Sequence, residues 1–140
     1  MRRIKGRNTS PELHVRKLLH AAGLRFRLHV KGLPGSPDLV FPARKVATFV
    51  HGCFWHQHNC HLSKPPEQRR EFWDQKLRLN RRRDAESLSQ LHALGWRTVV
   101  IWECSLRGRE RLLQSDVVEA AVRFIREGAE QTLEISGRCT

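Results

Sequence analysis

The sequence predicts an α/β domain in which helices flank a small mixed central sheet. Apolar residues recur at helical spacing in three stretches, and short β-branched or alternating runs lie between them. The chain has 140 residues, of which 39% are hydrophobic, and this is enough to bury one core. The expected order of elements is therefore helix, three strands, helix, strand and helix.

The first half is expected to begin with a helix over residues 10–22. A serine there suits the N-cap, a proline follows it, and a glycine ends the apolar pattern. Residues 25–30 alternate basic and apolar side chains, which predicts a half-buried strand. A turn rich in proline and glycine leads into a short apolar strand at 38–41. β-Branched residues predict a further strand at 45–50.

The second half is expected to contain a long helix at 67–94, with a break near Asn80. The run at 96–103 is the most strand-like in the chain, because β-branched and aromatic residues dominate it. A last helix is expected from about residue 115 to 128, where a glycine ends it. Residues 129–140 carry little periodic signal and are expected to form a flexible tail.

The chain is strongly basic, with 26 Lys and Arg against 14 Asp and Glu and a formal net charge of +12. In one domain, expected to span residues 1–128, this excess indicates a polyanionic partner such as nucleic acid. No apolar run approaches the length of a membrane span, and the N-terminus does not resemble a secretory signal. The cysteines are expected to be thiols or metal ligands. We expect a bacterial cytoplasmic protein that associates with the nucleoid.

Residues 49–61 concentrate four histidines, two cysteines and bare aromatic rings directly after a predicted strand. Imidazole and thiolate are the common ligands of zinc, and a Cys-x4-His-x-Cys cluster with one distant cysteine predicts a closed structural Zn²⁺ site. The predicted ligands are Cys53, His58, Cys60 and Cys104. Such a site would staple the loop to the end of strand 96–103. His56 and His61 are alternative imidazole ligands, and separate thiols are the alternative for the cysteines.

Asp38 opens a predicted strand after a turn and lies one short hairpin before His51. A carboxylate at a sheet edge can hold Mg²⁺, which prefers one or two carboxylates with water and phosphate oxygens. With His51 or His56 activating a water, the arrangement would suit hydrolysis of a phosphodiester. The alternative is an aspartate that only caps the turn, which is common after proline and glycine.

Several motifs together resemble the very-short-patch repair (Vsr) mismatch endonucleases. The matching segments are Leu33-Pro34-Gly35-Ser36-Pro37-Asp38, His51-Gly52-Cys53-Phe54-Trp55-His56, Glu71-Phe72-Trp73, Gly95-Trp96-Arg97, Trp102-Glu103-Cys104 and Leu106-Arg107-Gly108-Arg109-Glu110. They follow one another in the family's order over roughly residues 1–128. The block from 51 to 56 is highly specific.

The resemblance implies a PD-(D/E)xK nuclease with a restriction-endonuclease-like fold. It would nick double-stranded DNA on the 5′ side of the thymine in a T:G mismatch, the lesion left when 5-methylcytosine deaminates. By matching position, Asp38 is the Mg²⁺-binding carboxylate, helped by the backbone carbonyl of Val50. His56 is the general base, His51 supports the site, and Glu12 contributes from the first helix.

The resemblance also implies roles outside the hydrolytic centre. The four zinc ligands expected from spacing match those of the family, and Phe54, Trp55 and Trp73 match aromatic residues that wedge into the duplex beside the mismatch. The implied partners are DNA with a T:G mismatch and other mismatch-repair proteins, and the implied oligomeric state is a monomer. One departure is that Phe49-Val50-His51 stands where the wider superfamily usually carries Glu-x-Lys.

Three alternatives remain open from the sequence. A nickase with a different target would keep the same fold and the same hydrolytic residues. A non-catalytic, zinc-stabilised DNA-binding module would need the cysteines but would not need Asp38, His51 or His56. A basic structural protein of the nucleoid or ribosome would explain the charge, but it leaves the Asp-His-Cys arrangement without a purpose.

Overall fold

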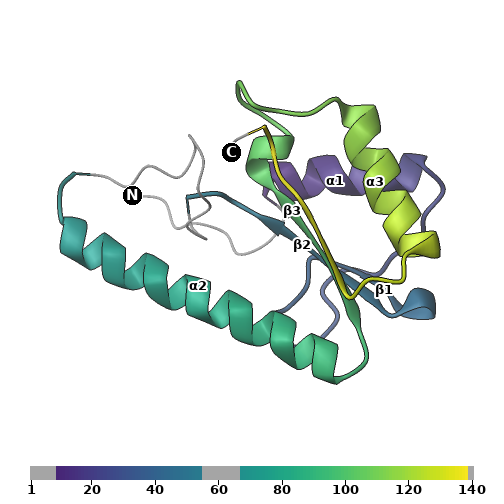
Figure 1. Cartoon of the computed structure of the whole chain (residues 1–140), viewed down its shortest axis with the longest axis horizontal. Coiled ribbons are helices and arrows are strands. Elements are labelled where there is room, and N and C mark those ends of the chain that lie inside the picture. Colours follow the sequence, from purple (N-terminus) through teal and green to yellow (C-terminus); the bar gives the residue numbers. More distant parts are fainter. Residues whose placement is uncertain (1–8, 55–66, 139–140) are drawn as a thin grey trace.

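A four-stranded sheet forms the centre of the fold, with its strands in the order β1-β2-β3-β4 (Figure 1). Strand β1 (Leu39–Phe41) pairs antiparallel with β2 (Val46–His51). Strand β3 (Arg97–Trp102) runs parallel to β2, and β4 (Thr132–Ile135) runs parallel to β3. The predicted α/β architecture with a small mixed sheet is therefore confirmed.

Three helices cover the two faces of this sheet (Figure 1). The structure, a computed structural model, describes residues 9–54 and 67–138. Helices α1 (Ser10–Ala21) and α3 (Gln114–Glu127) lie on one face, and α2 (Arg70–Ala93) lies on the other. Such a layered arrangement of helices on a mixed sheet fits a restriction-endonuclease-like fold. No helix of the described chain is long and apolar enough to cross a membrane.

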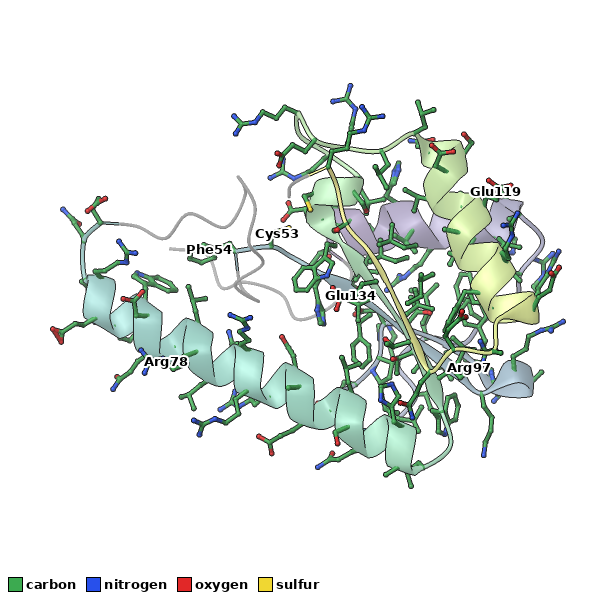
Figure 2. The ribbon with its side chains drawn as sticks, viewed as in Figure 1. Cys53, Phe54, Arg78, Arg97, Glu119 and Glu134 are labelled. Carbon is green, nitrogen blue, oxygen red and sulfur yellow. The ribbon has the colours of Figure 1, made fainter. Side chains whose placement is uncertain are left out.

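Helix α2 extends well beyond the sheet at its N-terminal end (Figure 1). Only Leu77 and Leu91 of its 24 residues are buried, and charged side chains such as Arg78 radiate into solvent (Figure 2). The break expected near Asn80 is wrong, because the helix is continuous from Arg70 to Ala93. One asparagine among arginines and leucines costs only tenths of a kcal/mol in helix propensity, so it does not end the helix.

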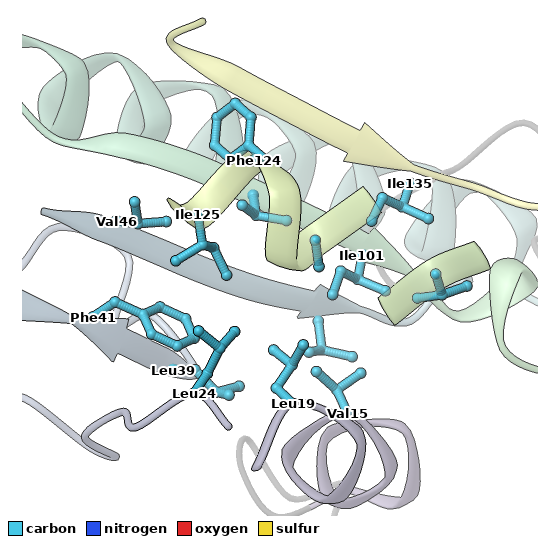
Figure 3. Close-up of a cluster of buried hydrophobic side chains, with 14 residues drawn as sticks. Val15, Leu19, Leu24, Leu39, Phe41, Val46, Ile101, Phe124, Ile125 and Ile135 are labelled. Carbon is cyan, nitrogen blue, oxygen red and sulfur yellow. The ribbon is translucent and has the colours of Figure 1, made fainter. Parts of the chain in front are cut away.

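The main hydrophobic core lies between the sheet and the pair α1 and α3 (Figure 3). Alternate residues of each strand point to this face, while α1 and α3 contribute residues at helical spacing. The central members are Val15, Leu19, Leu39, Phe41, Val46, Val99, Ile101, Val117, Ala121, Phe124, Ile125 and Ile135. All four strands contribute to it, so this core fixes their register.

A second, smaller cluster fills the opposite face beneath α2. It contains Ala47, Phe49, Cys53, Leu91, Val100, Trp102 and Cys104, with Leu33, Leu88 and Trp96 packed against it. The apolar side chains of β2 and β3 therefore alternate between two buried faces. This explains why both strands are nearly continuous apolar runs in the sequence.

The strand expected at 25–30 is reduced to one isolated bridge. Arg27 and Val40 exchange two backbone hydrogen bonds of 2.8 and 2.9 Å. The backbone of His29 then adopts the left-handed region, with φ at 54°, and this ends the pairing. Phe26 and Leu28 still pack against the main core, so the alternating pattern correctly predicted which side chains point inward.

The flexible tail expected at 129–140 is also wrong over most of its described length. Thr132–Ile135 form β4, and the Arg138 N–H donates to the Glu110 carbonyl oxygen at 2.8 Å. The strand is only four residues long, with Ile135 buried and Leu133 packed against the main core. The pairing with β3 supplies the order that composition does not indicate, and the sheet extends past the expected domain end at residue 128.

Candidate active site and nucleic-acid interface

The carboxylate of Asp38 lies at the edge of the sheet, directly before β1. The Asp38 backbone N–H donates to the Thr48 carbonyl oxygen at 2.9 Å, which extends the β1–β2 ladder by one rung. Its Oδ2 accepts the Val50 backbone N–H at 2.7 Å. The N–H and C=O of one strand residue point to the same side, so the Val50 carbonyl also points toward Asp38.

Glu12 brings a second carboxyl group to Asp38 from the first turn of α1. Its side chain is buried, with 3% of the residue exposed. The Thr9 hydroxyl donates to Oε1 at 3.3 Å, and Arg16 Nη2 lies 3.4 Å from Oε2. The N-terminal end of a helix favours a carboxylate, which helps to explain how an acidic residue is tolerated here.

The pKa of Asp38 is raised from 3.8 to about 7. Burial is the largest cause, because it disfavours the charged form. The Glu12 carboxyl raises the pKa further through its charge and a hydrogen bond, while the Val50 N–H and the charge of Arg16 lower it. Two carboxyl groups that meet in a buried place would both be stabilised as anions by a divalent cation.

The donor set around Asp38 fits a hard cation such as Mg²⁺. Two carboxyl groups and a backbone carbonyl converge there, and all three offer oxygen ligands. From the sequence, Glu12 is predicted to belong to the site only by the family resemblance. A simple signal was available, since Glu12 and Asp38 are the only acidic residues in the first 66 positions.

His51 is the last residue of β2 and is buried, with 6% of the residue exposed. Its ring contacts two aromatic rings, and its centroid lies 5.6 Å from that of Phe49 and 5.1 Å from that of Trp102. Adjacent residues of a strand point to opposite faces, so His51 faces the α2 side while Val50 faces the main core. His56, the other expected proton-transfer residue, lies outside the described residues.

Cys53 and Cys104 follow the paired parallel strands β2 and β3 at equivalent positions. His51 is the register partner of Trp102, and each cysteine lies two residues beyond its strand end. Both thiols are buried and belong to the second cluster. The Cys53 N–H donates to Glu103 Oε1 at 3.3 Å.

The environment of Cys104 suits a thiolate ligand of zinc. The Gly137 backbone N–H donates to Cys104 Sγ at 3.2 Å, a contact that strengthens when the sulfur is charged. His58 and Cys60 lie outside the described residues, and residues 9–54 and 67–138 alone contain no group of three or more metal ligands. Of the four expected zinc ligands, the structure therefore describes two, the buried thiols of Cys53 and Cys104, which the strand register places beyond neighbouring strand ends.

Aromatic rings gather near the N-terminal end of α2. The centroid of the Phe54 ring lies 5.6 Å from that of Trp73, and the Phe72 centroid lies 5.4 Å from that of Trp73. The guanidinium of Arg69 lies 4.4 Å above the Phe72 ring, and Phe72 is 44% exposed. Trp55, the third aromatic residue expected to wedge into DNA, lies outside the described residues.

Basic side chains surround this aromatic group. Those exposed on or next to α2 are Arg69, Arg70, Lys76, Arg78, Arg81, Arg82 and Arg83. An exposed row of cations beside stackable rings is the arrangement by which proteins grip a phosphate backbone and contact bases. The projecting N-terminal end of α2 is therefore suited to binding nucleic acid.

Comparison with known proteins identifies the family. A family model described as DNA mismatch endonuclease Vsr matches residues 1–62. The DNA mismatch endonuclease Vsr of Escherichia coli (strain K12) is 43% identical over 138 residues, which cover 98% of this chain and 88% of that protein. The chain belongs to the Vsr family. The resemblance found in the motifs is therefore confirmed, and this Vsr-family protein is a DNA endonuclease.

Other Vsr-like relatives are nicking enzymes. The type II nicking enzyme V.XorIIP of Xanthomonas oryzae pv. oryzae is 50% identical over 106 residues, or 76% of this chain and 78% of that enzyme. The type II nicking enzyme V.NmeAIP of Neisseria meningitidis is 38% identical over 116 residues, or 80% of this chain and 83% of that enzyme. The relatives of this chain are thus named either as mismatch endonucleases or as type II nicking enzymes.

Proposed function

We propose that this Vsr-family endonuclease nicks one strand of double-stranded DNA on the 5′ side of the thymine in a T:G mismatch. The observation that carries the proposal is the pairing of the buried Glu12 carboxyl group with the half-buried Asp38 carboxyl group beside the Val50 backbone. The relative from Escherichia coli, named a DNA mismatch endonuclease, supports the choice of substrate. Phosphodiester hydrolysis at such a pair is a metal-assisted reaction.

The proposed hydrolytic centre uses Mg²⁺ held by Asp38 and the carbonyl of Val50, with Glu12 as the second carboxylate. When bound, the ion supplies polarisation of the scissile phosphate and a bound water of lowered pKa. His56 acts as the general base that takes the proton of the attacking water. His51, in contact with two rings on the α2 side, supports the same centre.

The aromatic group supplies the proposed mismatch recognition. Phe54, Trp55 and Trp73 enter the duplex beside the mismatch, and the contact between the rings of Phe54 and Trp73 supports their acting together. A T:G pair stacks less well than a matched pair, so opening the step beside it costs less. Stacking on an aromatic side chain contributes roughly 1–3 kcal/mol per base.

A structural Zn²⁺ ion is proposed just beyond the ends of β2 and β3. Its ligands are Cys53, His58, Cys60 and Cys104, and the two buried thiols at the ends of β2 and β3 support this set. Elemental analysis is expected to find one zinc per chain, and Cys104→Ser is expected to release it and lower the melting temperature. Purified protein that is active and free of zinc would contradict this site.

The proposed biological setting follows from the substrate. A nuclease that repairs deaminated 5-methylcytosine works on chromosomal DNA, so we place the protein with the nucleoid in the bacterial cytoplasm. One chain carries both proposed metal sites and the aromatic wedge, which supports action as a monomer. Other mismatch-repair proteins are the proposed partners for the steps after the nick.

The proposed specificity is tested with Mg²⁺ and end-labelled duplexes that differ only in one T:G, T:A or C:G pair. The pair is placed once in a CC(A/T)GG-like context and once in a scrambled context. We expect a single nick on the 5′ side of the thymine in the T:G duplex alone, and none when EDTA is present. Equal nicking of all duplexes would contradict the proposed mismatch specificity but would still agree with nuclease activity.

A nickase of different specificity is the second candidate, and the nicking enzymes among the relatives favour it. It predicts cleavage at a defined sequence in the fully paired duplexes of the same series. A zinc-stabilised DNA-binding module without catalysis predicts binding to every duplex with no cleavage. The three outcomes are distinguished on one gel.

A further inference from the structure

The imidazole of His51 contacts two aromatic rings, those of Phe49 and Trp102. Phe49 precedes it by two residues on β2, and the Phe49 and His51 rings are tilted by 53°. Trp102 is its register partner on β3, and its ring meets the imidazole edge-on at 71°. Because the indole lies against the imidazole, a displacement of the Trp102 ring would change the packing around His51.

The Trp102 indole is in turn held by a carboxylate on β4. Its Nε1–H donates to Glu134 Oε1 at 3.0 Å. Figure 2 shows Glu134 on the outermost strand, and the side chain itself is exposed. An indole needs a hydrogen-bond acceptor for its one polar atom, and a carboxylate is a strong one. This hydrogen bond limits rotation of the indole within its own plane, a motion that contacts with the ring faces restrain less.

The strand register places these three side chains on one face of the sheet. Glu134 pairs with Val100, which lies two residues before Trp102 on the same side of β3. A second bond on this face links the same strands, since the Thr98 hydroxyl donates to the Thr132 hydroxyl at 3.0 Å. β4 is therefore tied to β3 through side chains as well as through its backbone.

We propose that Glu134 is a positioning residue for phosphodiester hydrolysis, which acts by holding the Trp102 indole against His51. This rests on the proposed role of His51 in the hydrolytic centre. It gives β4 a part in the reaction, although Glu134 lies 83 positions from His51 in the sequence. Hydrolysis is sensitive to such contacts because a displacement of about 1 Å in an active-site group can lower the rate 10²-fold.

The test measures single-turnover nicking of a T:G duplex by the full chain, with protein in excess, alongside the dissociation constant for the same DNA. Glu134→Ala is expected to lower the rate constant about tenfold and to leave DNA affinity within about twofold. Glu134→Gln keeps an oxygen acceptor and is expected to restore the rate. Glu130→Ala removes the same charge from the exposed turn before β4 and is the matched control.

A double-mutant comparison shows whether the effect passes through the indole. Trp102→Phe keeps an aromatic ring without the N–H, so adding Glu134→Ala to it is expected to change the rate by less than about twofold. Equal losses with and without the indole N–H would overturn the proposal, as would a wild-type rate for Glu134→Ala alone. Glu134 is exposed, so its variants remain informative even if Trp102→Phe folds poorly.

Two further measurements distinguish a positioning role of Glu134 from a general effect on stability, and test the role of His51 separately. In protein with isotope-labelled histidine, proton NMR contacts between the His51 and Trp102 rings are expected to weaken in Glu134→Ala and persist in Glu134→Gln. Unchanged contacts with a lowered rate would overturn the proposal. His51→Ala is measured separately: a wild-type rate there refutes the role of His51, whatever the Glu134 variants do.

Discussion

Asp38 is the residue on which the chemistry depends, and its unusual pKa gives a direct prediction. In the folded protein without Mg²⁺ its pKa is raised to about 7, chiefly by burial, whereas the unfolded chain has the ordinary value near 3.8. Between these two values the folded state holds a proton that the unfolded state has released. The free energy of unfolding should therefore fall as pH rises from about 4 to 7.

Asp38→Asn is expected to remove this pH dependence. The variant carries a neutral amide at every pH, so near pH 8 the Mg²⁺-free variant should be more stable than the wild type by on the order of 2 kcal/mol. Urea unfolding across pH 4–8 measures the difference. Glu130→Gln, at an exposed turn, is the control and should keep the wild-type slope. The same slope in Asp38→Asn would contradict the burial of a strained carboxyl pair.

The candidate site could be predicted from sequence only where the residue type itself is informative. The cysteines and histidines after β2 stand out by composition, and Asp38 stands out by following a turn. Trp102 and Glu134 could not be found in this way. Each is an ordinary strand residue, and their contact depends on the pairing of β3 with β4, which the sequence does not reveal.

At the scale of one element, α2 carries a buried residue and an aromatic residue one turn apart near its N-terminal end. Leu77 is 1% exposed, while Trp73, one turn earlier, contacts the Phe54 ring. Trp73→Ala is expected to weaken binding of the T:G duplex by roughly 1–3 kcal/mol with little change in stability. Leu77→Ala should instead lower the free energy of unfolding by about 2–5 kcal/mol.

Thermal unfolding and DNA titration of these two variants separate recognition from folding. If Trp73→Ala were destabilised as Leu77→Ala is and bound the mismatch normally, Trp73 would be a core residue and not a wedge.

The chain after β4 makes a close approach that only glycine permits. A Cβ on Gly137 would lie 2.5 Å from the carbonyl oxygens of Cys104 and Glu110. Gly137→Ala must therefore shift backbone at the end of β4, and we expect it to destabilise the protein by about 1–3 kcal/mol. Urea unfolding measures this change. Ser136→Ala, the adjacent change, should lie within about 0.5 kcal/mol of the wild type, and equal values for both variants would refute the steric account.

The elements themselves were predicted better than their limits. Long periodic stretches predicted α1, α2 and α3, and β-branched runs predicted β2 and β3. The two errors about strands, at 25–30 and 129–140, share a cause. Pairing between strands depends on distant partners, so one alternating segment remains a single bridge and another, of only four residues, forms a strand.

At the scale of the whole molecule, the net charge of +12 is unevenly distributed along the sequence. Positions 1–66 contain only Glu12 and Asp38 as acidic residues, so the carboxyl pair lies in the most basic half of the chain. Such a surface binds DNA through its phosphates, and the affinity should fall linearly with salt on a logarithmic scale.

The basic residues of α2 should account for part of that salt dependence. Replacing Arg81, Arg82 and Arg83 by alanine is expected to reduce the slope by about 0.9 for each DNA phosphate that the variant no longer neutralises. Replacing Arg123 and Arg126 on α3, which covers the other face of the sheet, should leave the slope unchanged. Fluorescence anisotropy with labelled duplex from 50 to 300 mM salt, roughly the range in which such interactions are screened, measures both. Equal slopes for the two sets would place the DNA elsewhere.

The central claim is that a DNA endonuclease acts through the carboxyl group of Asp38, and one measurement tests it most directly. Wild type and Asp38→Asn are assayed side by side on the T:G duplex with Mg²⁺, for nicking and for binding. We expect Asp38→Asn to bind the duplex with wild-type affinity within a few-fold and to nick it at no detectable rate, because the proposed metal site loses one of its two carboxylate ligands. Wild-type nicking by Asp38→Asn would contradict the claim and move the reaction to another part of the chain.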